Sequence, residues 1–165
     1  MAVTVNGMIA KSNGNVDFVS KANWRLFIRE ARLAGNMVMG RRTYDGMKRA
    51  GELKRFRGVR IIVVTSKPRR STDPNVLFTS LKPLGIVKLL EKEGFKEALV
   101  TGGGILNASF MKSGVIDDLF LYVEPVVIGS GIGLFSREGF DTRLRLAGAK
   151  KMPGEAILLH YRVDR

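Results

Sequence analysis

The sequence predicts a single α/β domain covering residues 1–165, with about eight strands in a mostly parallel mixed sheet, about four flanking helices and a C-terminal antiparallel hairpin. Short apolar runs alternate with amphipathic stretches along the chain, as in parallel strands joined by crossover helices. Several apolar runs end in glycine directly before a helix start. The length suffices to bury one core, and no linker or internal repeat divides the chain.

Apolar runs bounded by turn residues are predicted as strands. The run at 59–65 is apolar on both faces apart from Arg60 and Thr65, so it is expected at the centre of the sheet. The last two runs are joined by a Pro-Gly turn, which indicates a hairpin. The predicted strands are residues 2–5, 37–39, 59–65, 76–78, 98–101, 115–123, 143–150 and 156–163.

Four stretches are predicted as helices. The first follows the cap residue Ser20, has apolar residues at three- and four-residue spacing, and ends at Gly35. The fourth begins behind three consecutive glycines at 102–104, whereas the glycine-rich stretch 126–135 is not expected to be helical. The predicted helices are residues 21–34, 44–49, 84–93 and 104–112.

The composition excludes several classes of site. The chain has no cysteine and one histidine, His160, so disulfides, thiolate metal sites, histidine-based zinc sites and a Ser-His-Asp triad are not expected. No apolar run approaches the roughly 20 residues of a membrane helix, and the start is a short strand rather than a secretion signal. We therefore expect a cytoplasmic protein with no metal and no membrane association.

The formal net charge of +13 permits nucleic acid, an anionic surface or a phosphorylated small molecule as partner. The basic residues are dispersed, with no tail and little aromatic interleaving, which is typical of a solvated surface. The charge does not choose among these partners, but the dispersion of the basic residues makes sequence-directed nucleic-acid binding unexpected.

Three junctions lie just past the carboxyl end of an apolar strand: Gly40-Arg41-Arg42-Thr43, Thr65-Ser66-Lys67 and Gly102-Gly103-Gly104. In a parallel sheet these ends share one edge. Glycine turns at helix starts suit a pyrophosphate, and the neighbouring cations and hydroxyls suit a further phosphate, such as the 2′-phosphate of a nicotinamide dinucleotide. Ordinary helix capping and surface charge explain each junction when it is taken alone. Three junctions at the same edge of the sheet favour a ligand site.

Five segments, in order along the chain, carry a resemblance to a known family: Thr4-Val-Asn-Gly-Met-Ile-Ala10, Val38-Met-Gly-Arg-Arg-Thr-Tyr44, Val63-Val-Thr-Ser66, Gly102-Gly-Gly-Ile-Leu-Asn107, and Gly114-Val-Ile-Asp-Asp-Leu119 followed by Pro125-Val-Val-Ile-Gly-Ser-Gly131. They resemble the dihydrofolate reductase superfamily, most closely its branch related to the reductase domain of riboflavin biosynthesis. The resemblance spans nearly the whole chain and implies an eight-stranded mixed sheet flanked by helices.

The resemblance also implies that NADPH lies across the strand ends and transfers a hydride to a flat nitrogen heterocycle. The implied cofactor residues are Ile9 and Ala10 at the nicotinamide, Gly40, Arg41, Arg42 and Thr43 at the pyrophosphate, Thr65, Ser66 and Lys67 at the adenosine phosphate, and Gly102, Gly103, Gly104, Ile105 and Leu106 at the pyrophosphate and nicotinamide. The implied substrate residues are Asn6, Asn23, Trp24, Phe27, Arg32 and Asn107.

The sequence departs from the family pattern at the acidic residues expected near the substrate. Dihydrofolate reductases place a carboxylate on the first long helix, where this chain has Asn23, and riboflavin reductases often have a glutamate where this chain has Thr101. Asp17 is the nearest acid and the candidate proton donor, unless water serves or Asp17 only caps the helix entry. The stripe of Arg25, Arg29 and Arg32 suits a substrate phosphate or simply solvent.

Function is expected to be NADPH-dependent reduction of a riboflavin-pathway metabolite of the 5-amino-6-(5-phosphoribosylamino)uracil type, because the basic helix suits a ribosyl phosphate. One alternative is a dihydrofolate reductase with a relocated acid. Another is a basic nucleotide- or nucleic-acid-binding module that kept the fold without catalysis. Exposed edge strands in this branch are commonly paired, so a homodimer is expected.

Overall fold

The computed structural model describes residues 1–136 and 139–164. The helices are α1 (Lys21–Ala34), α2 (Arg41–Arg49), α3 (Pro83–Lys92) and α4 (Gly104–Lys112), with short 3-10 turns η1 (Glu52–Phe56) and η2 (Pro153–Glu155). The strands are β1 (Ala2–Thr4), β2 (Met8–Lys11), β3 (Asn36–Gly40), β4 (Arg60–Val64), β5 (Val76–Thr79), β6 (Asp118–Glu124), β7 (Gly131–Gly133), β8 (Leu144–Lys151) and β9 (Ile157–Val163). No helix in the described ranges is both long and apolar enough to cross a membrane.

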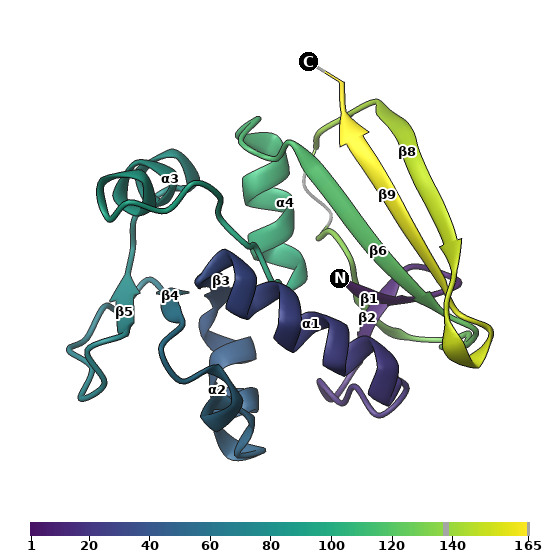
Figure 1. The fold of residues 1–165 in the computed structure, drawn as a ribbon, viewed down its shortest axis with the longest axis horizontal. Coiled ribbons are helices and arrows are strands. Elements are labelled where there is room, and N and C mark those ends of the chain that lie inside the picture. The colour runs from purple at the N-terminus through teal and green to yellow at the C-terminus, as the bar shows by residue number, and fades with distance from the viewer. Residues whose placement is uncertain (137–138, 165) are drawn as a thin grey trace.

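The strands form three sheets rather than one. Their orders are β1-β6-β9-β8, β2-β7 and β3-β4-β5. The pairs β1–β6, β3–β4 and β4–β5 are parallel, whereas β2–β7, β6–β9 and β8–β9 are antiparallel. The expectation of about eight strands in a mostly parallel sheet is therefore wrong, while the mixed character, the four helices and the C-terminal hairpin are confirmed (Figure 1).

The predicted strand at 98–101 is present only as an isolated parallel bridge between Val38 and Val100. The backbone still follows β3, because the Val38 N–H donates to the Leu99 carbonyl and the Thr101 N–H donates to the Val38 carbonyl, both at 2.8 Å. The side chain of the fully buried Asn36 makes two hydrogen bonds to this segment in place of further backbone ladder bonds. Its Nδ2 donates to the Glu97 carbonyl at 2.7 Å, and its Oδ1 accepts from the Leu99 N–H at 3.2 Å.

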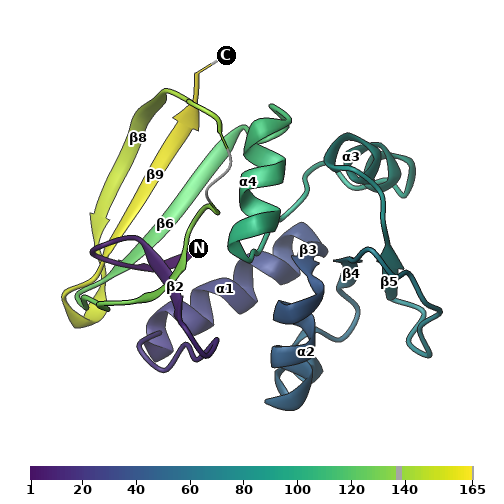
Figure 2. The same ribbon diagram turned by 180° about the vertical axis from the view of Figure 1, so that it is seen from behind.

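Helices cover both faces of the β3-β4-β5 sheet. Met37, Met39 and Val63 on one face pack in a core with residues of α1, α2 and η1. Val38 and Ile62 point the opposite way, because strand side chains alternate, and pack with residues of α3 and α4. In Figures 1 and 2 the sheet is flanked by α3 on one side and α2 on the other, and the β6-β9-β8 strands form the other half of the molecule.

Helix α1 begins and ends where the sequence predicts. The Ser20 side chain accepts a hydrogen bond from the Asn23 N–H at 3.2 Å and so caps the first turn. Gly35 adopts a left-handed conformation with φ of 68°, which only glycine adopts without a steric cost. The helix thus has both local termination signals in place.

Candidate cofactor and substrate site

The three predicted junctions lie at one edge of the β3-β4-β5 half. In the parallel register, Gly40 pairs with Val64 and Val64 pairs with Thr79, so the carboxyl ends of β3, β4 and β5 are level. The Gly40 N–H donates to the Gly102 carbonyl at 2.8 Å, which brings the glycine triplet against the end of β3. The convergence that the sequence predicts for these segments is therefore present in the structure.

Two helix starts meet at this edge. Gly40 is the N-cap of α2 and Gly103 is the N-cap of α4, and neither helix has a side-chain cap. A Cβ placed on Gly103 would lie 3.7 Å from Thr43 Oγ1, so the first turns of α2 and α4 are neighbours. The peptide between Gly102 and Gly103 is cis. Uncapped N–H groups at two neighbouring helix starts suit an anion.

The remaining predicted cofactor residues flank these helix starts. Arg41 and Arg42 are exposed on the first turn of α2, and Arg41 Nε is 3.9 Å from Asp45 Oδ2. Ile105 is exposed and Leu106 is buried on the first turn of α4. The exposed guanidinium groups remain available to a second anion.

Ile9 and Ala10 lie on β2 rather than at a helix start. The strand pairs with β7, opposite Gly131–Gly133. A Cβ on Gly131 would collide with the Ala10 carbonyl oxygen, so the two backbones approach closely here. The predicted nicotinamide residues therefore have a fixed backbone position.

A cavity of about 410 Å³ lies beside the second junction, between β4, β5, α3 and α4. Thr65 and Ser66, which are predicted at the adenosine phosphate, line it, and Leu106 contributes from the third junction, whereas Lys67 lies outside the lining. Sequence reasoning missed the other residues of the lining. The full set is Val64, Thr65, Ser66, Ser80, Leu81, Lys82, Pro83, Leu106, Ser109 and Phe110.

One signal for the missed residues was present in the sequence. Thr79-Ser80 repeats Thr65-Ser66 at the end of the next parallel strand. Both threonines make the same turn: Thr65 Oγ1 accepts from the Lys67 N–H at 3.2 Å, and Thr79 Oγ1 accepts from the Leu81 N–H at 3.1 Å. Comparing the ends of adjacent strands would have found the pair.

Two predicted substrate residues hold the glycine-rich segment that follows Pro125. Asn6 Nδ2 donates to the Ile128 carbonyl and Asn107 Nδ2 donates to the Leu134 carbonyl, each at 2.8 Å. These amides join β1 and α4 to the segment that contains β7. Their observed bonds are structural, and contact with a substrate stays a prediction for both.

Asn23 contacts an acid that sequence reasoning missed. Glu124, at the end of β6, has an exposed fraction of 2%, and Asn23 has one of 5%. Glu124 Oε1 accepts hydrogen bonds from the Ser20 N–H at 2.9 Å and from Asn23 Nδ2 at 3.0 Å. An acid therefore does lie at the first turn of α1, although it comes from 101 residues further along the chain.

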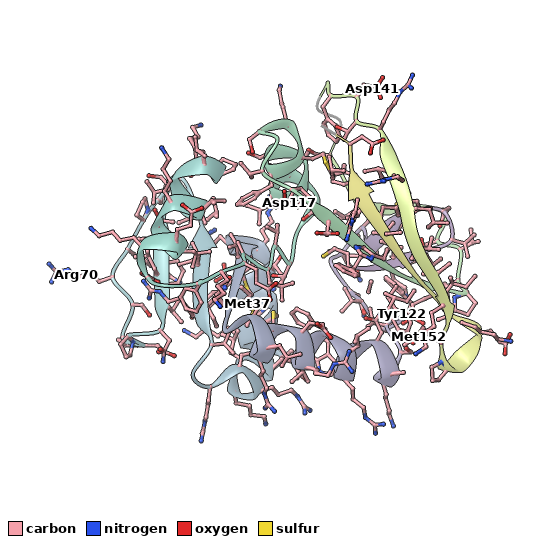
Figure 3. All side chains as sticks on the ribbon, turned by 45° about the horizontal axis from the view of Figure 1, so that its top comes forward. Met37, Arg70, Asp117, Tyr122, Asp141 and Met152 are labelled. Atoms are coloured by element: carbon pink, nitrogen blue, oxygen red, sulfur yellow. The ribbon has the colours of Figure 1, made fainter. Side chains whose placement is uncertain are left out.

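Tyr122 lies on the same face of β6 as Glu124, because side chains two residues apart in a strand point the same way. Its hydroxyl is buried and has no hydrogen-bond partner within the described ranges. Figure 3 shows Tyr122 in the half of the molecule away from Met37, where α1 meets the β6-β9-β8 strands. The interface beneath the start of α1 thus holds a polar group with unused hydrogen-bonding capacity.

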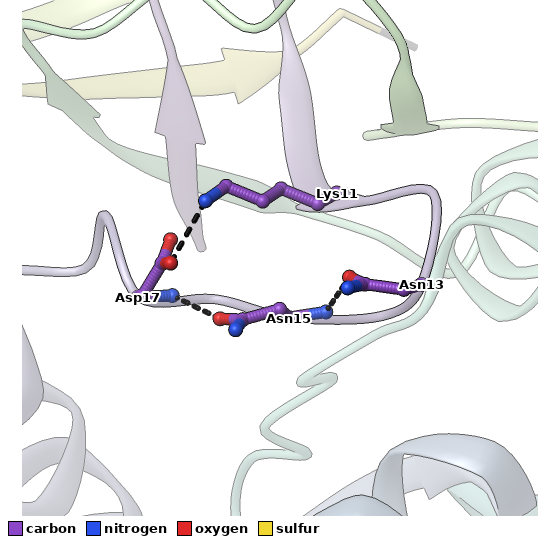
Figure 4. A network of polar contacts seen from close by, with 4 residues as sticks. All are labelled: Lys11, Asn13, Asn15 and Asp17. Atoms are coloured by element: carbon purple, nitrogen blue, oxygen red, sulfur yellow. Dashed lines mark hydrogen bonds and ion pairs between the residues drawn. The ribbon is translucent and has the colours of Figure 1, made fainter.

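Asp17, the predicted proton donor, forms an ion pair with Lys11 at the end of β2. Its Oδ2 lies 2.8 Å from Lys11 Nζ, and its side chain is 53% exposed. Asn13 and Asn15 fix the intervening loop by accepting hydrogen bonds from the N–H groups of Asn15 and Asp17 (Figure 4). Asp17 is therefore accessible and close to the strand that carries Ala10.

Trp24, Phe27 and Arg32 lie along α1 and are not gathered with the asparagines. Trp24 and Phe27 form an aromatic cluster with Phe56, with ring centroids 5.3 to 6.3 Å apart. Arg32 donates from Nη2 to the Arg55 carbonyl at 2.9 Å. Because a helix rises 1.5 Å per residue, Arg32 is about 13 Å from Asn23 along the axis.

Two titratable groups near the site have perturbed pKa values. Burial raises the pKa of the Tyr44 phenol, an effect that the nearby Arg69 opposes. Tyr44 packs edge-on against Phe78 at 5.2 Å, which seats α2 on the sheet. Burial lowers the pKa of the Met1 amino group to about 6, and this group donates to the Phe120 carbonyl.

Comparison with known proteins identifies the family. The model of the RibD C-terminal domain matches residues 1–158. The chain belongs to the RibD C-terminal domain family. This RibD C-terminal domain is 31% identical over 164 residues to the uncharacterized protein YwjB of Bacillus subtilis (strain 168), covering 98% of this chain and 94% of YwjB.

Solved structures share the fold of this RibD C-terminal domain. A Shewanella sp. PV-4 protein named for riboflavin biosynthesis aligns with a TM-score of 0.83 at 20% identity, covering 100% of this chain and 97% of that one. A Thermotoga maritima diaminohydroxyphosphoribosylaminopyrimidine deaminase/5-amino-6-(5-phosphoribosylamino)uracil reductase aligns with a TM-score of 0.77 at 17% identity. The alignment covers 99% of this chain and 55% of that one. The family supports an oxidoreductase, and the structural likeness supports the fold.

Proposed function

We propose that the protein is an NADPH-dependent reductase that transfers a hydride to a nitrogen heterocycle of the riboflavin pathway. The observation that carries the proposal is the convergence of two uncapped helix starts, at Gly40 and Gly103, on one edge of a parallel sheet. Such an edge is where open α/β sheets bind nucleotides. The dinucleotide is the ligand whose pyrophosphate matches two adjacent N-termini.

In the proposed complex the pyrophosphate lies between Gly40 and Gly103, with Arg41 and Arg42 beside it. The nicotinamide extends toward β2, where Ile9 and Ala10 border it, and the adenosine extends toward the end of β4. NADPH supplies the hydride when bound. This chain's own contribution is to fix the cofactor by backbone N–H groups, which need no reorganisation, and to hold the heterocycle near β2.

The heterocycle is proposed to lie between the first turn of α1 and the 11–17 loop. Asn23 lies at that turn, buried and bonded to Glu124, and Asp17 is the proposed proton donor, because it is exposed and follows β2. Arg25 and Arg29 follow on the exposed side of α1, where a ribosyl phosphate would meet positive charge. An aminopyrimidine ribosyl phosphate combines these chemical features.

One observation favours a second candidate, a dihydrofolate reductase with a relocated acid. Glu124 contacts Asn23 at the first turn of α1, so an acid from β6 lies where the helix itself has none. Reduction of a pterin needs an acidic group near the ring. The two candidates share the cofactor and differ in the heterocycle.

The decisive measurement is NADPH oxidation, followed by absorbance, with each of two substrates in separate reactions. We expect NADPH to bind and to be consumed with 5-amino-6-(5-phosphoribosylamino)uracil or its ribosyl phosphate analogues, and not with dihydrofolate. Consumption with dihydrofolate alone would favour the second candidate. Tight NADPH binding without turnover of either compound would contradict both, and salt-dependent RNA or DNA binding without NADPH binding would favour a non-catalytic basic module.

We further propose that the protein is a homodimer, formed through one face of the β6-β9-β8 strands. Residues paired across antiparallel strands point to the same face, and apolar side chains predominate on this face, with Lys151 of β8 opposite Ile157. Leu146 is 55% exposed and Ile157 is 45% exposed on it. An apolar face of this extent favours a protein partner. The face comprises Leu119, Leu121, Val123, Leu144, Leu146, Ala149, Lys151, Ile157, Leu159, Tyr161 and Val163.

Leu146→Lys is expected to convert the dimer into a monomer, because a charge at the centre of an apolar interface cannot be solvated there. Light scattering after size exclusion measures the mass, which is 18.2 kDa for one chain. Arg145→Ser, on the opposite face of β8, is the matched control and should remain dimeric. A wild-type protein that elutes as one chain at all concentrations would overturn this proposal.

A further inference from the structure

We propose that a second cavity, on the α2 side of β4 and β5, binds a small zwitterion with an apolar body, of the class of the apolar α-amino acids. The cavity has a volume of about 270 Å³ and lies between α2, η1, the amino ends of β4 and β5, and the loop before β5. None of the residues predicted for the cofactor, the heterocycle or proton transfer lines it. The inference therefore concerns a separate site and does not depend on the proposed reductase function.

This cavity lies toward the strand ends opposite to those that carry the glycine junctions. Gly58 and Val59 precede β4, and Asn75 precedes β5. The Ile61 N–H donates to the Asn75 carbonyl at 2.8 Å, which levels the two amino ends. In the described chain β5 is the outer strand of its sheet, so no further strand covers this side (Figure 1).

Tyr44 is the residue that points to a ligand. It lines the cavity and is only 6% exposed, and its ring packs against Phe78. Its hydroxyl forms no hydrogen bond with any residue in the ranges 1–136 and 139–164. Because burial raises the pKa of this phenol, the hydroxyl stays protonated at neutral pH and can donate. A buried phenol usually has a hydrogen-bond partner, so we expect the partner in the molecule that fills the cavity.

Two cations at the cavity are available to an anionic group. Lys54 and Arg57 are three residues apart at η1, a spacing that places side chains on one side of a 3-10 helix. Neither forms an ion pair within the described chain. Arg55, between them, pairs with Glu52 at 2.6 Å and lies outside the cavity lining. The two available cations suit a carboxylate.

Asp73 supplies the opposite charge from the loop before β5. Its Oδ1 accepts a hydrogen bond from the Asn75 N–H at 2.9 Å, and its carbonyl accepts from the Val76 N–H at 3.1 Å, so the turn is fixed. Its Oδ2 has no partner among the residues that the structure describes. This carboxylate oxygen is therefore available to an ammonium group.

The rest of the lining is mostly apolar and comes from η1 and the sheet. The volume lies just below the roughly 300–1,000 Å³ of sites for drug-sized ligands, which indicates a ligand of few heavy atoms. An apolar α-amino acid combines a carboxylate for the two cations and the phenol, an ammonium group for the acid, and a short hydrocarbon for the apolar walls. These walls are formed by Leu53, Phe56, Val59, Ile61 and Val76.

The test is a set of dissociation constants for leucine, 4-methylpentanoate and 3-methylbutan-1-amine, measured by calorimetry on the full chain. The three compounds share one hydrocarbon and differ in their charged groups. Leucine is expected to bind with a Kd of about 1 mM or below, and at least about fivefold more tightly than either analogue. Tyr44→Phe, which keeps the ring against Phe78, should raise the Kd for leucine about fivefold, because one hydrogen bond is lost.

Two charge variants assign the ends of the ligand. Asp73→Asn should weaken leucine and the amine and leave 4-methylpentanoate unchanged, because the amide oxygen still accepts from Asn75. Lys54→Ala should weaken leucine and 4-methylpentanoate and leave the amine unchanged. Lys48→Ala, an exposed site on α2 outside the cavity lining, is the matched control. The melting temperature of each variant establishes that it is folded.

Absence of leucine binding to the wild type at about 10 mM would overturn the inference, as would a Tyr44→Phe effect no larger than that of Lys48→Ala. Equal affinity for leucine and 4-methylpentanoate would show a simple anion site and overturn the zwitterion assignment. These outcomes are distinct from failure of the proposed function, because the measurement needs neither NADPH nor turnover. Leucine binding with the stated preferences supports the inference even if no heterocycle is reduced.

Discussion

Glu124→Ala is expected to lower the free energy of unfolding by about 3 kcal/mol, because it removes the acceptor for two buried donors. The Ser20 N–H and Asn23 Nδ2 both donate to Glu124 Oε1, and they lie at the start of α1, where a helix has unsatisfied N–H groups. For a chain of this length, the melting temperature should fall by about 6–12 °C. Thermal and urea unfolding measure the change.

Two control variants separate this effect from loss of charge in general. Glu124→Gln keeps an oxygen that accepts both bonds and should cost less than Glu124→Ala. Glu91→Ala, on the exposed side of α3, should change stability by less than about 0.5 kcal/mol. If Glu124→Ala unfolds at the wild-type urea concentration, the carboxyl group is not holding the start of α1.

Gly103→Ala is expected to weaken NADPH binding at least about tenfold while the fold is retained. A methyl group at this position would meet only Thr43 Oγ1, at 3.7 Å, and the backbone φ of −78° suits any residue. The added methyl would nevertheless lie between the first turns of α2 and α4, where the pyrophosphate is proposed to approach the backbone. Calorimetry gives the Kd, and the melting temperature should stay within about 2 °C.

The neighbouring Gly104→Ala variant should show the opposite pattern. A Cβ on Gly104 would lie 2.5 Å from the Gly133 carbonyl oxygen and 3.4 Å from the Ser136 nitrogen, so backbone must move. We expect a loss of about 1–3 kcal/mol in stability. Wild-type NADPH affinity in a well-folded Gly103→Ala protein would place the cofactor elsewhere.

Local signals made the helices and the glycine junctions predictable. Ser20 and Gly35 bound α1, and Gly103 precedes α4, because capping depends on residues close in sequence. The convergence of the three junctions followed from one rule, that parallel strands present their carboxyl ends at the same edge. The register that levels Gly40 with Val64 satisfies this rule.

Features that depend on long-range contacts were not predictable in this way. The predicted strand at 98–101 does not form a ladder: Asn36 and one isolated bridge hold it beside β3, and no pattern in a single sequence reveals such a side-chain contact. Glu124 was missed at the substrate region because its partner Asn23 is 101 residues away. Ser80, Lys82 and Ser109 were missed as lining residues because the cavity is assembled from four elements.

The attachment of residues 97–102 through Asn36 and a few bonds to β3 has a consequence for how this protein opens. Within the described chain, the backbone of these residues pairs with β3 alone, so their release requires loss of the Asn36 contacts, the bonds to Val38 and Gly40, and the core packing of residues 98–100. The amide protons of residues 97–102 should exchange with solvent through local fluctuations, whereas those of β3 and β4 should exchange only on global unfolding. The glycine turn would then be the part of this sheet edge that moves, while β3 and β4 stay fixed.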